Sequence, residues 1–255
     1  MTEGNYENLK KMIEGTGHPV SLKVSMILQR KGWYVRNAPR YSQKNDDSEL
    51  REIDIVGSKK SNLFEDSFNE LIIECKKQKD PWIFFKQTRK NEDKFTLNTN
   101  FAGYAAGYLD DSPESKHLFQ RHYYHKKELC TYFIVGCKNP EKGGPGATID
   151  RAINQVHNAL KFYIAQGGGD NPAFFYPIIV FDGEIFEASY RNEKLVMKKS
   201  NHISLYFEIE YDKPELFHSA KTGSLDTILE SKPYIIDIVK LSYFEKFLDS
   251  IEMKS

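Results

Sequence analysis

The spacing of apolar residues predicts a helix followed by three strands in the first third of the chain. Four apolar residues recur at helical spacing before Gly32, which ends the segment: Val20, Val24, Ile27 and Leu28. Aromatic and β-branched residues then predict a strand that begins at Trp33. Apolar runs at 50–56 and 69–76 predict two more strands, so the expected order is helix, strand, strand, strand.

The second half of the chain shows a clearer helix and further strands. Apolar residues keep one helical face over 147–166, and three glycines follow, which predicts a helix that ends there. Asp182-Gly183 between two apolar runs predicts a β-hairpin. We also expect a strand over 203–211 and a closing helix over 234–251.

Composition limits the class of protein. The chain has 255 residues, of which 40% are hydrophobic, which suffices for a substantial core. No apolar run reaches the roughly 20 residues of a membrane helix, and the N-terminus lacks the apolar core of a signal peptide. Three cysteines make no disulfide framework, so we expect a reducing, cytoplasmic compartment and no membrane. A net charge of zero argues against a strongly basic surface that binds nucleic acid nonspecifically, but it permits a local basic groove.

Polar side chains interrupt the second and third predicted strands. Asp54 lies between Ile53 and Ile55, whereas Glu74 and Lys76 are two residues apart and so leave one face of their strand. An ionised group in such a position is costly to bury unless something pairs with it. If the two strands pair, Asp54 and Glu74 converge, and two carboxylates at one point repel each other unless a divalent cation lies between them.

A site with only hard oxygen ligands suits Mg²⁺ or Mn²⁺. Lys76 beside it would orient a water molecule or the charge that develops on a phosphate, which suits hydrolysis of a phosphodiester. On the residues alone, a solvent-facing strand pair with cross-strand salt bridges in an unrelated α/β protein stays open as the other interpretation.

Asp54 followed by Glu74-Cys75-Lys76 is similar to the Asp…Glu-X-Lys signature of the PD-(D/E)XK nuclease superfamily, which has the restriction-endonuclease-like fold. Residues 17–77 and 147–183 also resemble that family in the order of their elements. The resemblance implies an α/β fold with a central mixed β-sheet flanked by helices. It implies that Asp54, Glu74 and the Cys75 carbonyl ligate Mg²⁺ and that Lys76 serves the nucleophilic water.

The domain organisation follows from the same resemblance. We expect a nuclease-like core over 1–190 with an insertion at about 78–146, and a C-terminal extension over 191–255 that packs on the core. Gln155 matches a polar position on the later helix of the family, where it would support Lys76 or contact phosphate, with an ordinary exposed glutamine as the alternative.

The expected activity is a Mg²⁺-dependent nuclease that hydrolyses phosphodiester bonds, with DNA as the substrate, in restriction, defence or repair. Lys77 is expected to support the site or to contact nucleic acid. A homodimer is expected too, because two sites cut two strands most simply.

The first predicted helix departs from the family pattern. Many members carry a glutamate there that completes the metal site, but the matching residue is Ser21, and Glu14 lies earlier. The alternative function is therefore an inactive nucleic-acid-binding or interaction module that retains the nuclease fold.

Overall fold

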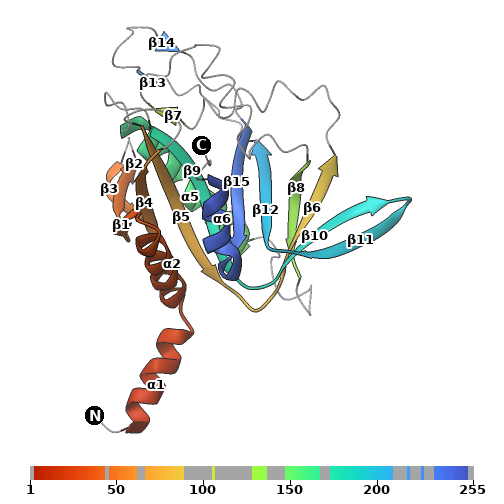
Figure 1. The fold of residues 1–255 in the computed structure, drawn as a ribbon, viewed down its shortest axis with the longest axis horizontal. Coiled ribbons are helices and arrows are strands. Elements are labelled where there is room, and N and C mark those ends of the chain that lie inside the picture. The colour runs from red at the N-terminus through yellow and green to blue at the C-terminus, as the bar shows by residue number, and fades with distance from the viewer. Residues whose placement is uncertain are drawn as a thin grey trace.

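A large mixed sheet with helices on both faces forms the centre of the molecule in the computed structural model (Figure 1). This arrangement confirms the α/β class and the mixed central sheet flanked by helices. The structure describes residues 3–43, 46–61, 67–88, 105–106, 128–136, 147–166, 173–208, 217–218, 225–226 and 233–251.

The N-terminal part builds one end of the sheet from an antiparallel meander. Its elements are α1 (Glu3–Glu14), α2 (His18–Arg30), β1 (Tyr34–Asn37), β2 (Arg40–Gln43), β3 (Asp46–Glu52), β4 (Ile55–Lys60) and β5 (Phe68–Lys77). Strand β4 pairs antiparallel with both β1 and β5, while β2 and β3 form a hairpin of their own. Figure 1 shows α1 projecting from the rest of the molecule.

The remaining elements extend this sheet. They are β6 (Trp82–Thr88), β7 (Ala105–Ala106), β8 (Glu128–Val135), α5 (Ala147–Gln166), β9 (Ala173–Asp182), β10 (Ile185–Arg191), β11 (Lys194–Ser200), β12 (His202–Glu208), β13 (Phe217–His218), β14 (Leu225–Asp226), β15 (Pro233–Lys240), the 3-10 helix Leu241–Tyr243 and α6 (Phe244–Ile251). The strand order is β1-β4-β5-β9-β15-β12-β8-β6-β10-β11, with β7 also on β9. Segments 78–146 and 191–255 thus both contribute strands to the same sheet as the core, and the predicted division into domains stays a prediction.

Several predicted elements are confirmed. Helix α2 buries Val20, Val24 and Leu28, and Gly32 follows it with a φ of 77°, a left-handed conformation that favours glycine. Helix α5 has the predicted bounds, and β5 extends the predicted third strand by one residue at each end.

Three predictions about strands were wrong. The expected strand over 50–56 is broken, because β3 ends at Glu52 and β4 begins at Ile55. The segments flanking Asp182-Gly183 do not form a hairpin, because β9 pairs with β5 and β15 whereas β10 pairs with β6 and β11. The first part of the expected closing helix is strand β15, whose β-branched residues pair in parallel with β9.

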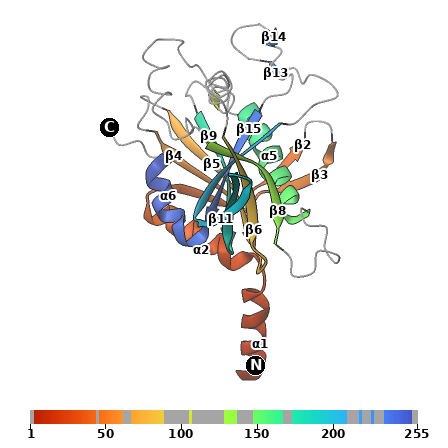
Figure 2. The same ribbon diagram turned by 90° about the vertical axis from the view of Figure 1, so that its right-hand side faces the viewer.

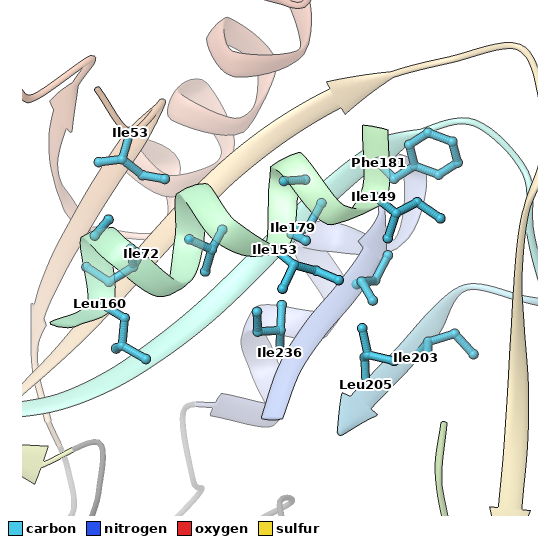
Figure 3. Close-up of a cluster of buried hydrophobic side chains, with 14 of the residues drawn as sticks. Ile53, Ile72, Ile149, Ile153, Leu160, Ile179, Phe181, Ile203, Leu205 and Ile236 are labelled. Carbon is cyan, nitrogen blue, oxygen red and sulfur yellow. The ribbon is translucent and has the colours of Figure 1, made fainter. Parts of the chain in front are cut away.

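The two faces of the sheet are covered by different helices. Helix α5 packs on one face, where Ile72, Ile153 and Ile179 belong to one buried cluster (Figure 3). Helices α2 and α6 pack on the other face, against a second cluster that includes Ile73 and Val180. Because neighbouring residues of β5 alternate between these clusters, Glu74 lies on the α5 side and Cys75 on the side of α2 and α6.

Candidate active site

Asp54 lies directly before β4, where the regular pairing of β4 with β5 ends. Asn37 pairs with Ile55 across β1 and β4, and the Ala38 amide donates to the Asp54 carbonyl at 2.8 Å, so this pairing continues towards β2 and β3. Ile55 also pairs with Ile73 on β5, which places Asp54 next to Glu74 along the same register. The sequence therefore brings the two acids together, as expected, although Asp54 lies in a bend before β4 and not within a strand.

The Asp54 carboxylate accepts a hydrogen bond from β5 that a backbone carbonyl would accept in a regular strand pair. The Cys75 amide donates to Asp54 Oδ2 at 2.7 Å. Because the N–H and C=O groups of one extended residue point to the same edge of a strand, the Cys75 carbonyl oxygen also points towards this side. Burial raises the pKa of Asp54, whereas the Cys75 amide and Lys76 lower it.

Glu74 is almost fully buried, with 3% of its surface exposed. Burial, together with the charge of Asp54, raises the pKa of Glu74 from 4.5 to about 7, against the opposing effect of Lys76. Both acids are therefore harder to ionise than in water, and the charge of Asp54 adds to this cost at Glu74. A cation held between them would relieve that repulsion.

Lys76 connects the two acids to helix α5. Its Nζ donates to Glu74 Oε1 and, at 3.0 Å, to Oε1 of Gln155, which lies 79 residues further along the chain. Gln155 was predicted from the sequence to support Lys76, and the structure places its side chain in that position. The exposed-glutamine alternative is wrong, because Gln155 is half-buried and bonded.

Tyr41 from the β2–β3 hairpin covers this cluster. Its hydroxyl donates to the Gln155 carbonyl at 3.4 Å, and its ring lies 5.5 Å from that of Phe162. Burial raises the pKa of Tyr41 to about 12, while Arg51 lowers it and Glu74 raises it further. The charge of Glu74 thus contributes to the raised pKa of the Tyr41 hydroxyl, which stays protonated at neutral pH.

An open groove of about 600 Å³ lies beside Gln155, between the β2–β3 hairpin and the first half of α5. It is lined by Tyr41, Arg51, Glu52, Ala147, Asp150, Arg151, Asn154, Gln155 and Asn158. Sequence reasoning missed most of these residues. The signal was present, since Arg151, Asn154 and Asn158 follow one another at three- and four-residue spacing, on a helical face next to Gln155.

The other predicted site residues lie elsewhere around β5. The Cys75 thiol is buried on the α2 side, where burial raises its pKa well above the ordinary value and the Ser21 hydroxyl lowers it. Lys77 Nζ donates to the Glu14 carbonyl at 2.6 Å, so it joins the end of α1 to β5. Ser21 therefore lies beside the motif strand, but on the face opposite to Glu74.

The donor set suits a hard divalent cation. Two carboxylates and the Cys75 carbonyl supply oxygen ligands alone, which is the chemistry that Mg²⁺ and Mn²⁺ prefer. Within the described ranges, no group of three or more His, Cys, Asp or Glu side chains could hold a metal ion. A cation here would thus rest on Asp54 and Glu74, with water completing its coordination.

No protein-family model matches the chain, and comparisons with curated proteins and with solved structures found no match. In the part of the chain that the structure describes, no helix has the length and apolar character needed to cross a membrane.

Proposed function

We propose that this protein is a Mg²⁺-dependent nuclease with a restriction-endonuclease-like core, which hydrolyses phosphodiester bonds in DNA. The observation that carries the proposal is the convergence of Asp54, Glu74 and Lys76 at one end of the β4–β5 ladder, with Gln155 joining them from α5. The order of α2, three antiparallel strands, α5 and β9 also supports it.

Each side chain has a distinct task in this proposal. Asp54 and Glu74 would hold the metal ion, which would polarise the phosphate and lower the pKa of a bound water molecule. Lys76 orients the attacking water through its ammonium protons and places a positive charge where charge grows on the phosphate. Gln155 Oε1 accepts a hydrogen bond from Lys76 Nζ at 3.0 Å and so fixes the direction of the lysine side chain.

The adjacent groove fits the substrate strand. Arg51 and Arg151 offer guanidinium groups for phosphate, and Asn154 and Asn158 offer amide donors. The groove is lined by Gln155, which bonds to Lys76, so the groove lies next to the proposed catalytic cluster.

A cleavage assay on labelled duplex and single-stranded DNA in Mg²⁺ or Mn²⁺ tests the proposal. Lys76→Met should lower the rate by about 100-fold or more, the usual effect of removing a positioned charge or proton-transfer group. Lys77→Met is the matched control, because it removes the neighbouring charge, which bonds to the Glu14 carbonyl outside the cluster. Equal rates for wild type and Lys76→Met would refute the catalytic assignment.

A second candidate is a nucleic-acid-binding module that keeps this fold without cleaving. The residue type at Ser21 favours it, because a serine stands where many members of the resembled family carry a glutamate and supplies no carboxylate to the site. Titration calorimetry with Mn²⁺ separates the two functions. Binding that Glu74→Gln abolishes supports the nuclease, whereas DNA binding without metal binding or cleavage supports the module.

A further inference from the structure

The sheet face that carries α2 and α6 is covered unevenly. These helices pack on β5, β9 and β15, where their apolar residues join a buried cluster. At the other end of the sheet, β8, β10 and β11 present large apolar side chains to solvent on this face: Tyr132, Ile134, Tyr190, Leu195 and Met197. We call these five residues the apolar sheet face. Figure 2 shows these strands turned towards the viewer.

Strand registers show that these residues lie on one surface. Tyr132 is opposite Phe85, Phe85 is opposite Ala188, and Ala188 is opposite Met197, so one row crosses four strands. Paired residues in neighbouring strands point to the same side of a sheet.

A second row runs parallel to the first, and a third pair completes the surface. In the second row Ile134 is opposite Ile83, and Ile83 is opposite Phe186. Tyr190 and Leu195 form the third pair, near the end of the β10–β11 hairpin. The apolar sheet face is therefore a continuous surface and not a set of scattered exposed side chains.

The reverse side of β6, β8 and the start of β10 is buried, whereas β11 is exposed on both sides. Trp82, Phe84 and Ile185 alternate with residues of the apolar sheet face and belong to the cluster beneath α5. The Trp82 ring stacks on that of Phe181 at 4.0 Å, which fixes the orientation of β6. Over β6, β8 and the start of β10, one side is thus ordinary protein core, while the other has the composition of a core and is partly exposed to solvent.

The size of this surface suits a protein interface. Tyr132 and Tyr190 are 70% and 72% exposed, and Leu195, Met197 and Ile134 are 50%, 45% and 41% exposed. With about 200 Å² for a large side chain, these five expose about 500 Å². A stable interface buries about 800 Å² on each partner, and the half-buried Ile83, Phe85 and Phe186 supply further area.

The chemistry of the surface favours protein over nucleic acid. Its rows contain one cation, Lys199 opposite Phe186, and that lysine forms an ion pair with Glu184 at 3.4 Å. A phosphate-binding surface needs several cations, whereas the core of a protein interface is enriched in aromatic residues and methionine and depleted of charge.

We propose that the apolar sheet face is the contact between two copies of this chain in a two-fold symmetric dimer. The chain has no net charge, so two copies do not repel each other at long range. Tyr132 lies at one end of the surface and Leu195 at the other, so a two-fold axis through the middle brings each tyrosine onto the aliphatic end of the other copy. Two sheets pack in this way at about 10 Å.

Sedimentation velocity in EDTA tests the proposal without reference to metal or substrate. The wild type should be a dimer at about 10 µM, as expected for a Kd near 1 µM or below. Met197→Glu should raise the Kd by about 100-fold or more, because it buries a charge in the contact.

The matched control is Val196→Glu, since Val196 is the next residue of β11, is 43% exposed and faces the opposite side of the sheet. It should leave the dimer intact. Tyr190→Lys is a second contact variant, and because Tyr190 is 72% exposed the substitution leaves the core of the monomer intact. Circular dichroism checks the fold of each variant.

A monomeric wild type at about 50 µM overturns the proposal. So does equal dissociation by Val196→Glu and Met197→Glu, because the contact would then not belong to this face. A dimer that dissociates only with Met197→Glu and Tyr190→Lys supports it, whether or not the protein cleaves DNA.

Discussion

Replacing Glu74 by Gln should stabilise the metal-free protein while removing its capacity for cleavage. Glu74 is 3% exposed and lies beside a second carboxylate, so its ionised form is costly to keep in the folded state. Gln has nearly the same shape and carries no charge. The prediction therefore separates the stability of the site from its proposed chemistry.

The pKa of Glu74 gives the size of the effect. Burial and Asp54 raise this pKa from 4.5 to about 7, which corresponds to about 3 kcal/mol between the ionised and neutral forms. Because the folded pKa is the higher one, this contribution to stability is present below pH 4.5 and is lost as the pH rises through 7. Above that range, Glu74→Gln should be more stable than wild type by up to about 3 kcal/mol, or roughly 5–10 °C in Tm.

Urea unfolding in EDTA, followed by the fluorescence of the two tryptophans, measures this difference at pH 4.5 and pH 8. Wild type and Glu74→Gln should have similar stability at the lower pH and should diverge at the higher one. Other titrating groups act on both proteins, so they cancel in the comparison. Mg²⁺ should then raise the stability of the wild type at pH 8 and leave Glu74→Gln almost unchanged.

One result would refute the reasoning. If the stability difference between the two proteins is the same at both pH values, the Glu74 carboxylate is not costly to ionise in the fold. Glu74 and Asp54 would then be sufficiently solvated, or far enough apart, that no cation is needed to hold them together.

Three further predictions concern the surroundings of the site. Gln155→Leu removes the acceptor for Lys76 at 3.0 Å, so kcat should fall about 10-fold with little change in KM, and an unchanged kcat would contradict this positioning role. Burial lowers the pKa of His157 from 6.5 to about 4, so the free energy of unfolding should fall by up to about 3 kcal/mol as the pH drops from 6.5 to 4. His157→Gln should remove this loss, which urea unfolding at several pH values measures. A Cβ on Gly183 would lie 2.4 Å from Phe181 Cζ, so Gly183→Ala should cost about 1–3 kcal/mol in thermal unfolding, whereas Gly17→Ala, with 3.9 Å to its nearest atom, should be nearly neutral in packing.

Local periodicity correctly predicted helices that bury one face and strands that are buried along most of their length. Helix α5 and strand β5 were found from spacing alone, because each has one pattern and strong signals at its ends. The segment 234–240 fits both a buried helix and a buried strand by its apolar content. Parallel pairing with β9 decides between them, and no local pattern shows which strands pair.

Pairing also explains the missed hairpin. An Asp-Gly turn between apolar runs usually joins adjacent antiparallel strands. Here both edges of β9 are occupied by parallel neighbours, β5 and β15, so the next strand must leave and pair with β6. The hairpin forms one strand later, between β10 and β11, where Asn192 and Glu193 adopt positive φ angles of 49° and 62°.

The candidate site depends on the place where a regular ladder ends. The sequence pattern predicted that Asp54 and Glu74 converge if their strands pair, but an unbroken strand over 50–56 would place a backbone carbonyl opposite β5. Instead, Ala38, with a φ of 47°, stays paired with Asp54 as the β2–β3 hairpin turns towards α5. The Asp54 carboxylate thereby reaches the Cys75 amide.

The same departure brings the hairpin over the helix. Tyr41 then contacts α5 at Gln155, and Gln155 contacts Lys76, so the motif strand, the bend and the helix become one hydrogen-bonded unit. A substitution at Ala38 that disturbs this backbone bond should therefore perturb the position of Asp54, although Ala38 lies outside the motif. A site of this kind is specified by the residues that make a strand leave its neighbour, and these lie outside any Asp…Glu-X-Lys pattern.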